Sequence, residues 1–159
     1  MALSTFSAPI GDRWFEDYVV GAAYEFGPTA LTEADIVGFA RLYDPQDMHV
    51  DAALAAKSAF GGLIASGWQT VGVLMRLAVD HYLSHVASIV SPGVDELRWL
   101  KPVRPGDALT LRVTTLESRP SASRPDRGLV LSRLEGVNQD GEIVCSMKAM
   151  NLMLRRPAA

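Results

Sequence analysis

Cysteine is nearly absent from this chain of 159 residues, which has a single thiol at Cys145. One cysteine excludes an intramolecular disulfide and fits a reducing compartment. The sequence also lacks an apolar run long enough to cross a bilayer. Its opening, MALSTFSAPIGDRWFEDY, lacks the basic start and apolar core of a secretory signal. We therefore expect a cytoplasmic protein that does not associate with membranes.

An excess of positive charge is also lacking. Lysine and arginine total 15 against 18 acidic residues, which gives a net charge of −3. A nucleic-acid-binding surface normally carries a basic excess, so we expect no nucleic-acid partner. Hydrophobic residues make up 48% of the chain and charged residues 21%, the composition of an ordinary folded protein. The length suits one domain, which we expect to span residues 1–159.

The first half of the chain predicts one strand followed by helices. After a strand within GAAYEFGPTALT, Thr32 begins a helix, because Thr32 and Asp35 form a capping-box pattern, and Pro45 ends it. A short helix, AALAAK, follows a cap at Asp51, and a longer helix is expected from Gly67 to Leu83. The apolar stripe of the longer helix is expected to contain Trp68, Val71, Met75, Ala78, Val79 and Tyr82.

The second half of the chain predicts four strands. They are SIVSPGVDELRWL, ALTLRVTTLES, RGLVLSRLEGVNQ and EIVCSMKAMNLML. RPGDA marks one turn, and NQDGE is a strong hairpin signal. The segment from Ser118 to Gly128 is rich in Ser, Pro and Arg and is interpreted as a surface loop. This order of elements predicts an α+β fold in which a long helix is laid on one antiparallel sheet.

The stretch YDPQDMHVD, Tyr43 to Asp51, combines three carboxylates with one histidine. Asp44 and His49 lie five positions apart, and Pro45 keeps the segment irregular, so both side chains can converge on one water molecule. Such a pair can remove a proton from water and deliver one to carbon, for which a histidine pKa of about 6.5 is suited. Alternatively, Asp44 only caps a turn and His49 is a partly buried loop residue. These two residues alone favour that second interpretation.

The motif FGGLIASGW, Phe60 to Trp68, adds a second feature. Ser66 or Gly67 stands at the start of the long helix, where unpaired N–H groups point outward with the positive end of the helix dipole. Such groups can bind a carbonyl oxygen on which negative charge develops. The alternative is a glycine needed only for the turn into the helix. The acid–base pair, the glycine turn and the apolar helix in one segment together favour a catalytic site.

Four motifs, taken in order, resemble the MaoC-like dehydratases, the (R)-specific enoyl-CoA hydratase group of the hot-dog fold. They are RWFEDYVVG (Arg13 to Gly21), FARLYDPQDMHVD, FGGLIASGW and LRWLKPVRPGDALTLRV (Leu97 to Val113). The resemblance covers most of the chain. It implies a single hot-dog domain, in which an antiparallel sheet wraps around a long central helix. It also implies a homodimer or a dimer of dimers, which suits the exposed edge of such a sheet.

The resemblance further implies addition of water to a trans-2-enoyl thioester of coenzyme A, or the reverse dehydration. Asp44 and His49 would activate the water and supply the α-proton, and the Gly67 N–H would hold the thioester carbonyl. No metal or redox cofactor is implied, because the thioester itself acidifies the α-carbon, and coenzyme A enters only as part of the substrate. The residues expected to contact the substrate are Gln46, Gly62, Ser66 and Trp68.

The chain departs from the usual family motif, Asp-x-Asn-Pro-x-His, at two positions. Gln46 stands where Asn is expected and could make a similar amide hydrogen bond, and Asp47 stands where Pro is expected. If Asp47 faced the site it would raise the pKa of Asp44 by like-charge repulsion, but we expect it to face solvent. These changes leave open a non-catalytic acyl-thioester binding protein. A hot-dog thioesterase also stays open, although the long helix offers only Asp80, near its far end, to direct water.

Overall fold

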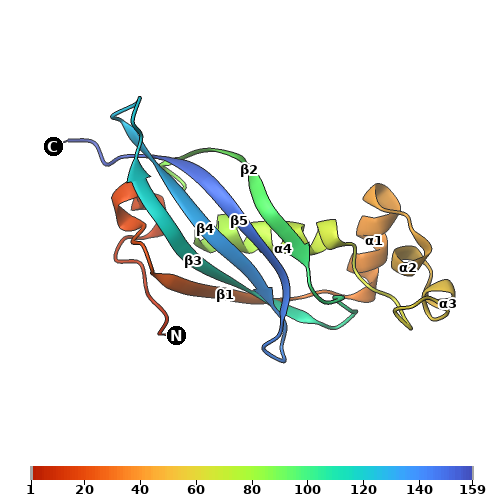
Figure 1. Ribbon diagram of the computed structural model, residues 1–159. Coiled ribbons are helices and arrows are strands. Elements are labelled where there is room, and N and C mark those ends of the chain that lie inside the picture. The colour runs from red at the N-terminus through yellow and green to blue at the C-terminus, as the bar shows by residue number, and fades with distance from the viewer. Residues whose placement is uncertain (1, 159) are drawn as a thin grey trace.

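The computed structural model describes residues 2–158 and has the predicted order of one strand, helices and four strands (Figure 1). Two short 3-10 turns, η1 (Ile10–Asp12) and η2 (Phe15–Asp17), precede the strand β1 (Ala23–Ala30). The helices are α1 (Glu33–Tyr43), α2 (Asp47–Val50), α3 (Ala52–Ala55) and α4 (Gly67–His81). The remaining strands are β2 (Ser88–Trp99), β3 (Ala108–Pro120), β4 (Arg127–Val137) and β5 (Ile143–Leu154).

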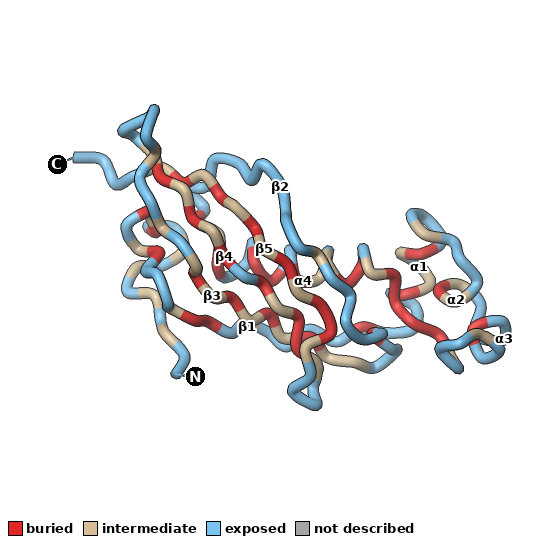
Figure 2. The backbone as a smooth tube through the Cα atoms, in the orientation of Figure 1, coloured by how far each residue is buried: buried red, intermediate tan, exposed pale blue. Residues whose placement is uncertain are grey.

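The five strands form one antiparallel sheet in the order β1-β3-β4-β5-β2. The central strands β3, β4 and β5 alternate buried with more exposed residues, because every second side chain faces the core (Figure 2). β1 and β2 are the edges of the sheet, and nearly all of β2 is exposed. The predicted α+β architecture, with a long helix on one antiparallel sheet, is confirmed.

The helix α4 crosses one face of the sheet (Figure 1). The apolar residues that it buries in the core are Leu74, Leu77 and Ala78. The expected stripe is wrong in part, because three of its members are exposed: Trp68, Met75 and Val79. Both the face of α4 that packs on the core and its outward face carry apolar residues, and the expected stripe included members of both faces. Of the helices between residues 2 and 158, none has the length and apolar character to cross a membrane.

The helices α1 and α3 begin at the caps expected from the sequence. The Asp35 N–H donates to Thr32 Oγ1 at 3.1 Å and the Thr32 N–H donates to Asp35 Oδ2 at 2.9 Å, a reciprocal capping box. The Asp51 carboxylate accepts from two N–H groups at the start of α3. Between α1 and α3, the helix α2 forms a single turn in the segment that was expected to be irregular. Pro45 ends α1 but leaves the residues after it free to turn again.

The connection between β3 and β4 is shorter than the loop expected from Ser118 to Gly128. Residues 118–120 pair with residues 128–130, so the two strands extend into this polar segment and leave residues 121–126 as the turn. The NQDGE hairpin between β4 and β5 forms as predicted, with Gly141 at a φ of 78°.

The N-terminal arm fixes the far end of α4. Arg13 is buried, and its guanidinium donates to the carbonyl oxygens of His81 at 2.9 Å and Tyr82 at 2.8 Å. The Tyr18 hydroxyl donates to the same Tyr82 carbonyl at 2.9 Å and accepts from the Ser84 N–H at 3.0 Å. These contacts pair carbonyl groups that the end of a helix leaves without partners. They hold α4 in place on the sheet.

Replacing Tyr18 with phenylalanine would leave the Ser84 N–H without its acceptor and remove one donor to the Tyr82 carbonyl. We expect Tyr18→Phe to lower the free energy of unfolding by about 1–3 kcal/mol, the cost of unpaired buried polar groups. Urea denaturation measures this change. Tyr43→Phe removes a hydroxyl from a side chain that is 72% exposed and serves as the control. It should change the free energy by less than about 0.5 kcal/mol. Equal effects of the two variants would contradict the role given to Tyr18.

Candidate active site

The candidate site lies where α1 ends, α2 turns and α4 begins, at the end of the molecule where α1, α2 and α3 gather (Figure 1). A pocket of about 420 Å³ opens there, lined by side chains within residues 44–49, 60–70 and 99–103. Pockets for small molecules span about 300–1,000 Å³, so this one is towards the small end of the range. The three segments are far apart in the sequence and meet only in the folded chain.

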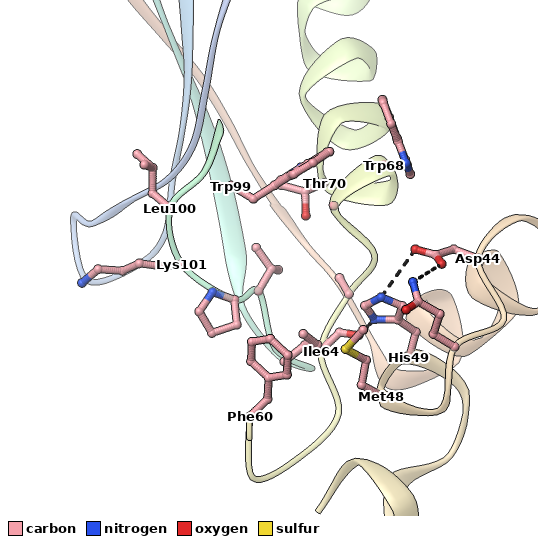
Figure 3. A pocket seen from close by; sticks show the side chains of 15 residues that line it. Asp44, Met48, His49, Phe60, Ile64, Trp68, Thr70, Trp99, Leu100 and Lys101 are labelled. Carbon is pink, nitrogen blue, oxygen red and sulfur yellow. Dashed lines mark hydrogen bonds and ion pairs between the residues drawn. The ribbon is translucent and has the colours of Figure 1, made fainter. Parts of the chain in front are cut away.

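Asp44 and His49 converge on this pocket, as Figure 3 shows. Asp44 follows the last residue of α1, where its own N–H donates to the Ala40 carbonyl at 2.8 Å. His49 belongs to the single turn of α2. Its Nε2 is 3.4 Å from Asp44 Oδ2, and the two side chains are 6% and 19% exposed, respectively. The acid–base pair expected from the sequence is thus close together and largely shielded from water.

A backbone carbonyl sets the orientation of the His49 ring. His49 Nδ1 is 2.8 Å from the Ile64 carbonyl oxygen. Since a carbonyl only accepts hydrogen bonds, Nδ1 carries the hydrogen, and Nε2 of the neutral ring has the lone pair. Nε2 faces Asp44 Oδ2, which is also an acceptor. The two atoms can therefore accept both hydrogens of one water molecule, or share a proton when the ring is charged.

Two neutral donors keep Asp44 ionised. Gln46 Nε2 donates to Asp44 Oδ1 at 2.7 Å, and Ser66 Oγ donates to Asp44 Oδ2 at 2.7 Å. These two hydrogen bonds, that from Gln46 first, lower the pKa of Asp44 below its ordinary value, although partial burial opposes them. Asp44 is therefore a carboxylate at neutral pH. Gln46 makes the kind of amide contact that was expected from it despite the change from Asn.

Ser66 connects Asp44 to the start of α4. Its side chain is fully buried, and its hydroxyl accepts from the Trp68 N–H at 3.2 Å while donating to Asp44. Ser66 is thus the N-cap of α4. Gly67 follows as the first helical residue and lines the pocket. The N–H at this position has no acceptor within the helix, and the helix dipole favours negative charge beside it.

Space, rather than backbone conformation, explains the glycine at position 67. Gly61 in the same motif has a φ of 65° and makes the turn, whereas Gly67 is an ordinary helical residue. A Cβ atom at position 67 would lie 2.8 Å from Cδ2 of Trp99 and closer still to two other indole atoms. Trp99, the last residue of β2, therefore packs directly against Gly67. Trp99 could not be identified from the sequence, because only the fold brings the end of β2 to the start of α4.

The residues singled out from the sequence fall into two groups. Five line the pocket: Asp44, Gln46, His49, Gly67 and Trp68. Ser66 is buried behind Asp44, and Gly62 lies outside the lining, beside the guanidinium of Arg104. Asp47 is exposed and outside the lining, as expected. Among residues 2–158, no three His, Cys, Asp or Glu side chains gather so that they could hold a metal ion.

The fold and the pocket define a hot-dog protein with a paired carboxylate and histidine beside the start of its central helix. Residues 17–129 match the MaoC like domain, and the chain belongs to this family. It is similar to the crystal structure of a MaoC-like dehydratase from Rhodospirillum rubrum, with a TM-score of 0.85 and 39% identity. That match covers 92% of this chain and 99% of the other.

Two curated relatives are similar over most of their length. The protein YdeM of Bacillus subtilis is 31% identical over 78% of this chain and 86% of its own. The 3-hydroxybutyryl-CoA dehydratase of Methylorubrum extorquens is 30% identical over 81% of this chain and 80% of its own. These matches confirm the family that the four motifs indicated.

Removing the Gln46 amide should raise the pKa of Asp44. We expect Asp44 in Gln46→Met to titrate at a higher pH than in the unchanged protein, because the strongest cause of its lowered pKa is lost. Carboxyl-carbon NMR measures the titration midpoint. Asp47→Asn, which removes the exposed neighbouring charge, is the control and should leave the midpoint unchanged.

Gln46→Met should also change the pH dependence of the stability of the fold. A lowered folded-state pKa means that ionised Asp44 stabilises the fold above its unfolded-state pKa, and that this contribution is lost as the pH falls through the folded-state value. Gln46→Met should therefore be less stable than the unchanged protein at neutral pH and differ less from it in strong acid. An unchanged titration midpoint of Asp44 in Gln46→Met would contradict the role given to the Gln46 amide.

Proposed function

We propose that this protein adds water to the double bond of a trans-2-enoyl-CoA to give a 3-hydroxyacyl-CoA, or catalyses the reverse dehydration. The observation that supports this most is the meeting of Asp44, His49 and Gly67, the first residue of α4, in the lining of one pocket. Membership of the MaoC-like family and similarity to a 3-hydroxybutyryl-CoA dehydratase support the same class of reaction. Hydration and dehydration pass through the same transition state, so one set of residues serves both.

The Gly67 N–H activates the substrate. It donates a hydrogen bond to the thioester carbonyl, which draws electrons from the conjugated double bond and makes the β-carbon electrophilic. The negative charge that develops on the carbonyl oxygen is stabilised by this N–H and by the N-terminal end of α4. A water molecule that donates to both His49 Nε2 and Asp44 Oδ2 then attacks the β-carbon.

Asp44 and His49 transfer the proton. As the C–O bond forms, one proton of the water passes to the pair, and a proton from the pair completes the C–H bond at the α-carbon when the enolate collapses. The hydration consumes one water molecule and no other reactant. If Nε2 takes the proton, the Ile64 carbonyl stabilises the imidazolium through Nδ1–H. The thioester supplies the acidity of the α-carbon, so this reaction calls for no metal or redox cofactor.

A thioesterase would need a carboxylate that directs water to the thioester carbon. Asp80, the single acid on α4, lies at the opposite end of the helix from Gly67 and outside the pocket lining. It forms a 2.7 Å ion pair with Arg76 instead. A non-catalytic binding protein could use the same pocket, but binding alone does not require a carboxylate kept ionised beside an imidazole. The position of Asp80 therefore favours the hydratase over a thioesterase, and the ionised Asp44 beside His49 favours it over a binding protein.

Loss of either member of the pair should abolish most of the activity. We expect Asp44→Asn and His49→Ala each to lower kcat/KM for crotonyl-CoA by at least about 100-fold, the usual contribution of general acid–base catalysis. Loss of the enoyl-thioester absorbance measures hydration, and Asp80→Asn should keep the full rate. Normal activity in either variant would remove that residue from the mechanism. Release of free thiol without hydration would favour a thioesterase, and binding without turnover would favour a binding protein.

We also propose that two copies associate through β2 and the adjoining face of α4. β2 is an edge strand that is exposed along nearly its whole length, and such edges invite pairing. The outward face of α4 carries the exposed Trp68, Met75 and Val79, a patch that marks an interaction site. The family resemblance supports a homodimer or a dimer of dimers, formed by a single domain over residues 1–159 in the cytoplasm.

Light scattering tests this association. We expect a particle of at least twice the chain mass of 17.2 kDa. Val94→Lys on β2 and Met75→Lys on α4 should each shift the population towards a single chain, because a lysine charge would be buried between the copies. Val19→Lys, at an exposed site outside β2 and α4, is the matched control. A single chain in the unchanged protein would contradict the proposal.

A further inference from the structure

An indole occupies the space beside Gly67. Trp99 ends β2, and its ring lies between the end of this strand and the first turn of α4 (Figure 3). The ring fills the volume that a side chain at position 67 would take. Trp68 meets the same ring edge-on, with ring centroids 5.3 Å apart. Two indoles therefore stand beside the N–H that is proposed to hold the thioester carbonyl.

Trp99 also marks where the pocket stops. Val71 lies one turn after Gly67 on the same side of α4, and Leu97 lies two residues before Trp99 on β2. Val71 and Leu97 are half-buried and pack against the core, yet neither lines the pocket, whereas Trp99 does. Apolar surface thus continues between α4 and β2 beyond the indole, but the pocket does not reach it.

The remaining walls of the pocket suit an uncharged acyl group. Met48, Phe60 and Ile64 supply apolar surface. Apart from Asp44 and His49, the charged side chain of the lining is Lys101, which forms an ion pair with Glu142. A second carboxylate on the acyl group would therefore have to compete with Glu142 for its cation.

We propose that Trp99 determines acyl-chain length: its indole closes the pocket at the end that lies between β2 and α4, so the protein acts on short, uncharged acyl thioesters in preference to long ones. This inference rests on the function proposed above and deepens it by naming the substrate class. A longer chain has to displace the indole, which the first turn of α4 holds at Gly67. One methylene more or less in an apolar pocket changes kcat/KM by about tenfold or more.

Chain-length profiles test the role of Trp99. We expect the unchanged protein to prefer crotonyl-CoA over trans-2-octenoyl-CoA in kcat/KM by at least about tenfold. Trp99→Ala should shift this ratio towards octenoyl-CoA by at least about tenfold, because the path along Val71 opens. Trp99→Phe keeps most of the ring and should shift the ratio less. Trp14→Phe changes a tryptophan outside the pocket lining and should leave the ratio unchanged.

Two results would overturn the proposal. One is an unchanged ratio in a folded, active Trp99→Ala protein, and the other is a preference of the unchanged protein for trans-2-dodecenoyl-CoA. If Trp99→Ala does not fold, as judged by circular dichroism and gel filtration, Trp99→Leu takes its place. The leucine variant keeps an apolar side chain but removes the ring, so its preference should also shift towards octenoyl-CoA. An unchanged ratio of the two substrates in this variant would count against the role of Trp99.

Calorimetry with saturated thioesters separates this inference from the hydratase function, because butyryl-CoA and octanoyl-CoA bind without reacting. We expect butyryl-CoA to bind at least about tenfold more tightly than octanoyl-CoA, and Trp99→Ala to remove or reverse this difference. If no enoyl-CoA is hydrated but this pattern holds, the hydratase proposal fails and the assignment of Trp99 stands. Equal affinities of the two thioesters for the unchanged protein overturn the assignment whatever the activity.

Discussion

The hydrogen bond from the Ser66 hydroxyl to Asp44 joins the two parts of the chain on which the candidate site depends. Asp44 closes α1 and Ser66 caps α4, and they are 22 residues apart in the sequence. The same hydroxyl accepts the Trp68 N–H, so the cap of α4 and the charge of Asp44 belong to one network. One buried side chain thus links Asp44, which is paired with His49, to the start of α4, where the carbonyl is proposed to bind.

Features that depend on neighbouring residues could be predicted from the sequence. The capping box of Thr32 and Asp35, the stop at Pro45 and the cap at Asp51 all rest on contacts within a few residues, so spacing alone identifies them. The strands of the second half alternate because one face of the sheet is buried, and this alternation is visible in the sequence. The order of elements follows from these local signals.

Features that depend on distant segments could not be predicted. Hydrophobic periodicity did not show which side of α4 faces the sheet, because Trp68 and Leu74 lie on different faces and both are apolar. The single turn of α2 is too short to show any period. Ser66 was expected to contact the substrate, but its tie to Asp44 is visible only once α1 and α4 are placed together. Trp99 is a strand residue in the sequence and a pocket wall in the fold.

The pocket and the exposed apolar surface meet at Trp68 and Trp99. The two side chains are 59% and 47% exposed, and both line the pocket. Any partner that covers the edge of β2 and the outward face of α4 therefore also covers the two indoles at this end of the pocket. In the proposed dimer this would remove water from around the Gly67 N–H and the Asp44–His49 pair, and their electrostatic effects are stronger in a medium of low dielectric constant. Association would then complete the site and cover the two indoles that the folded chain leaves exposed beside Asp44 and His49.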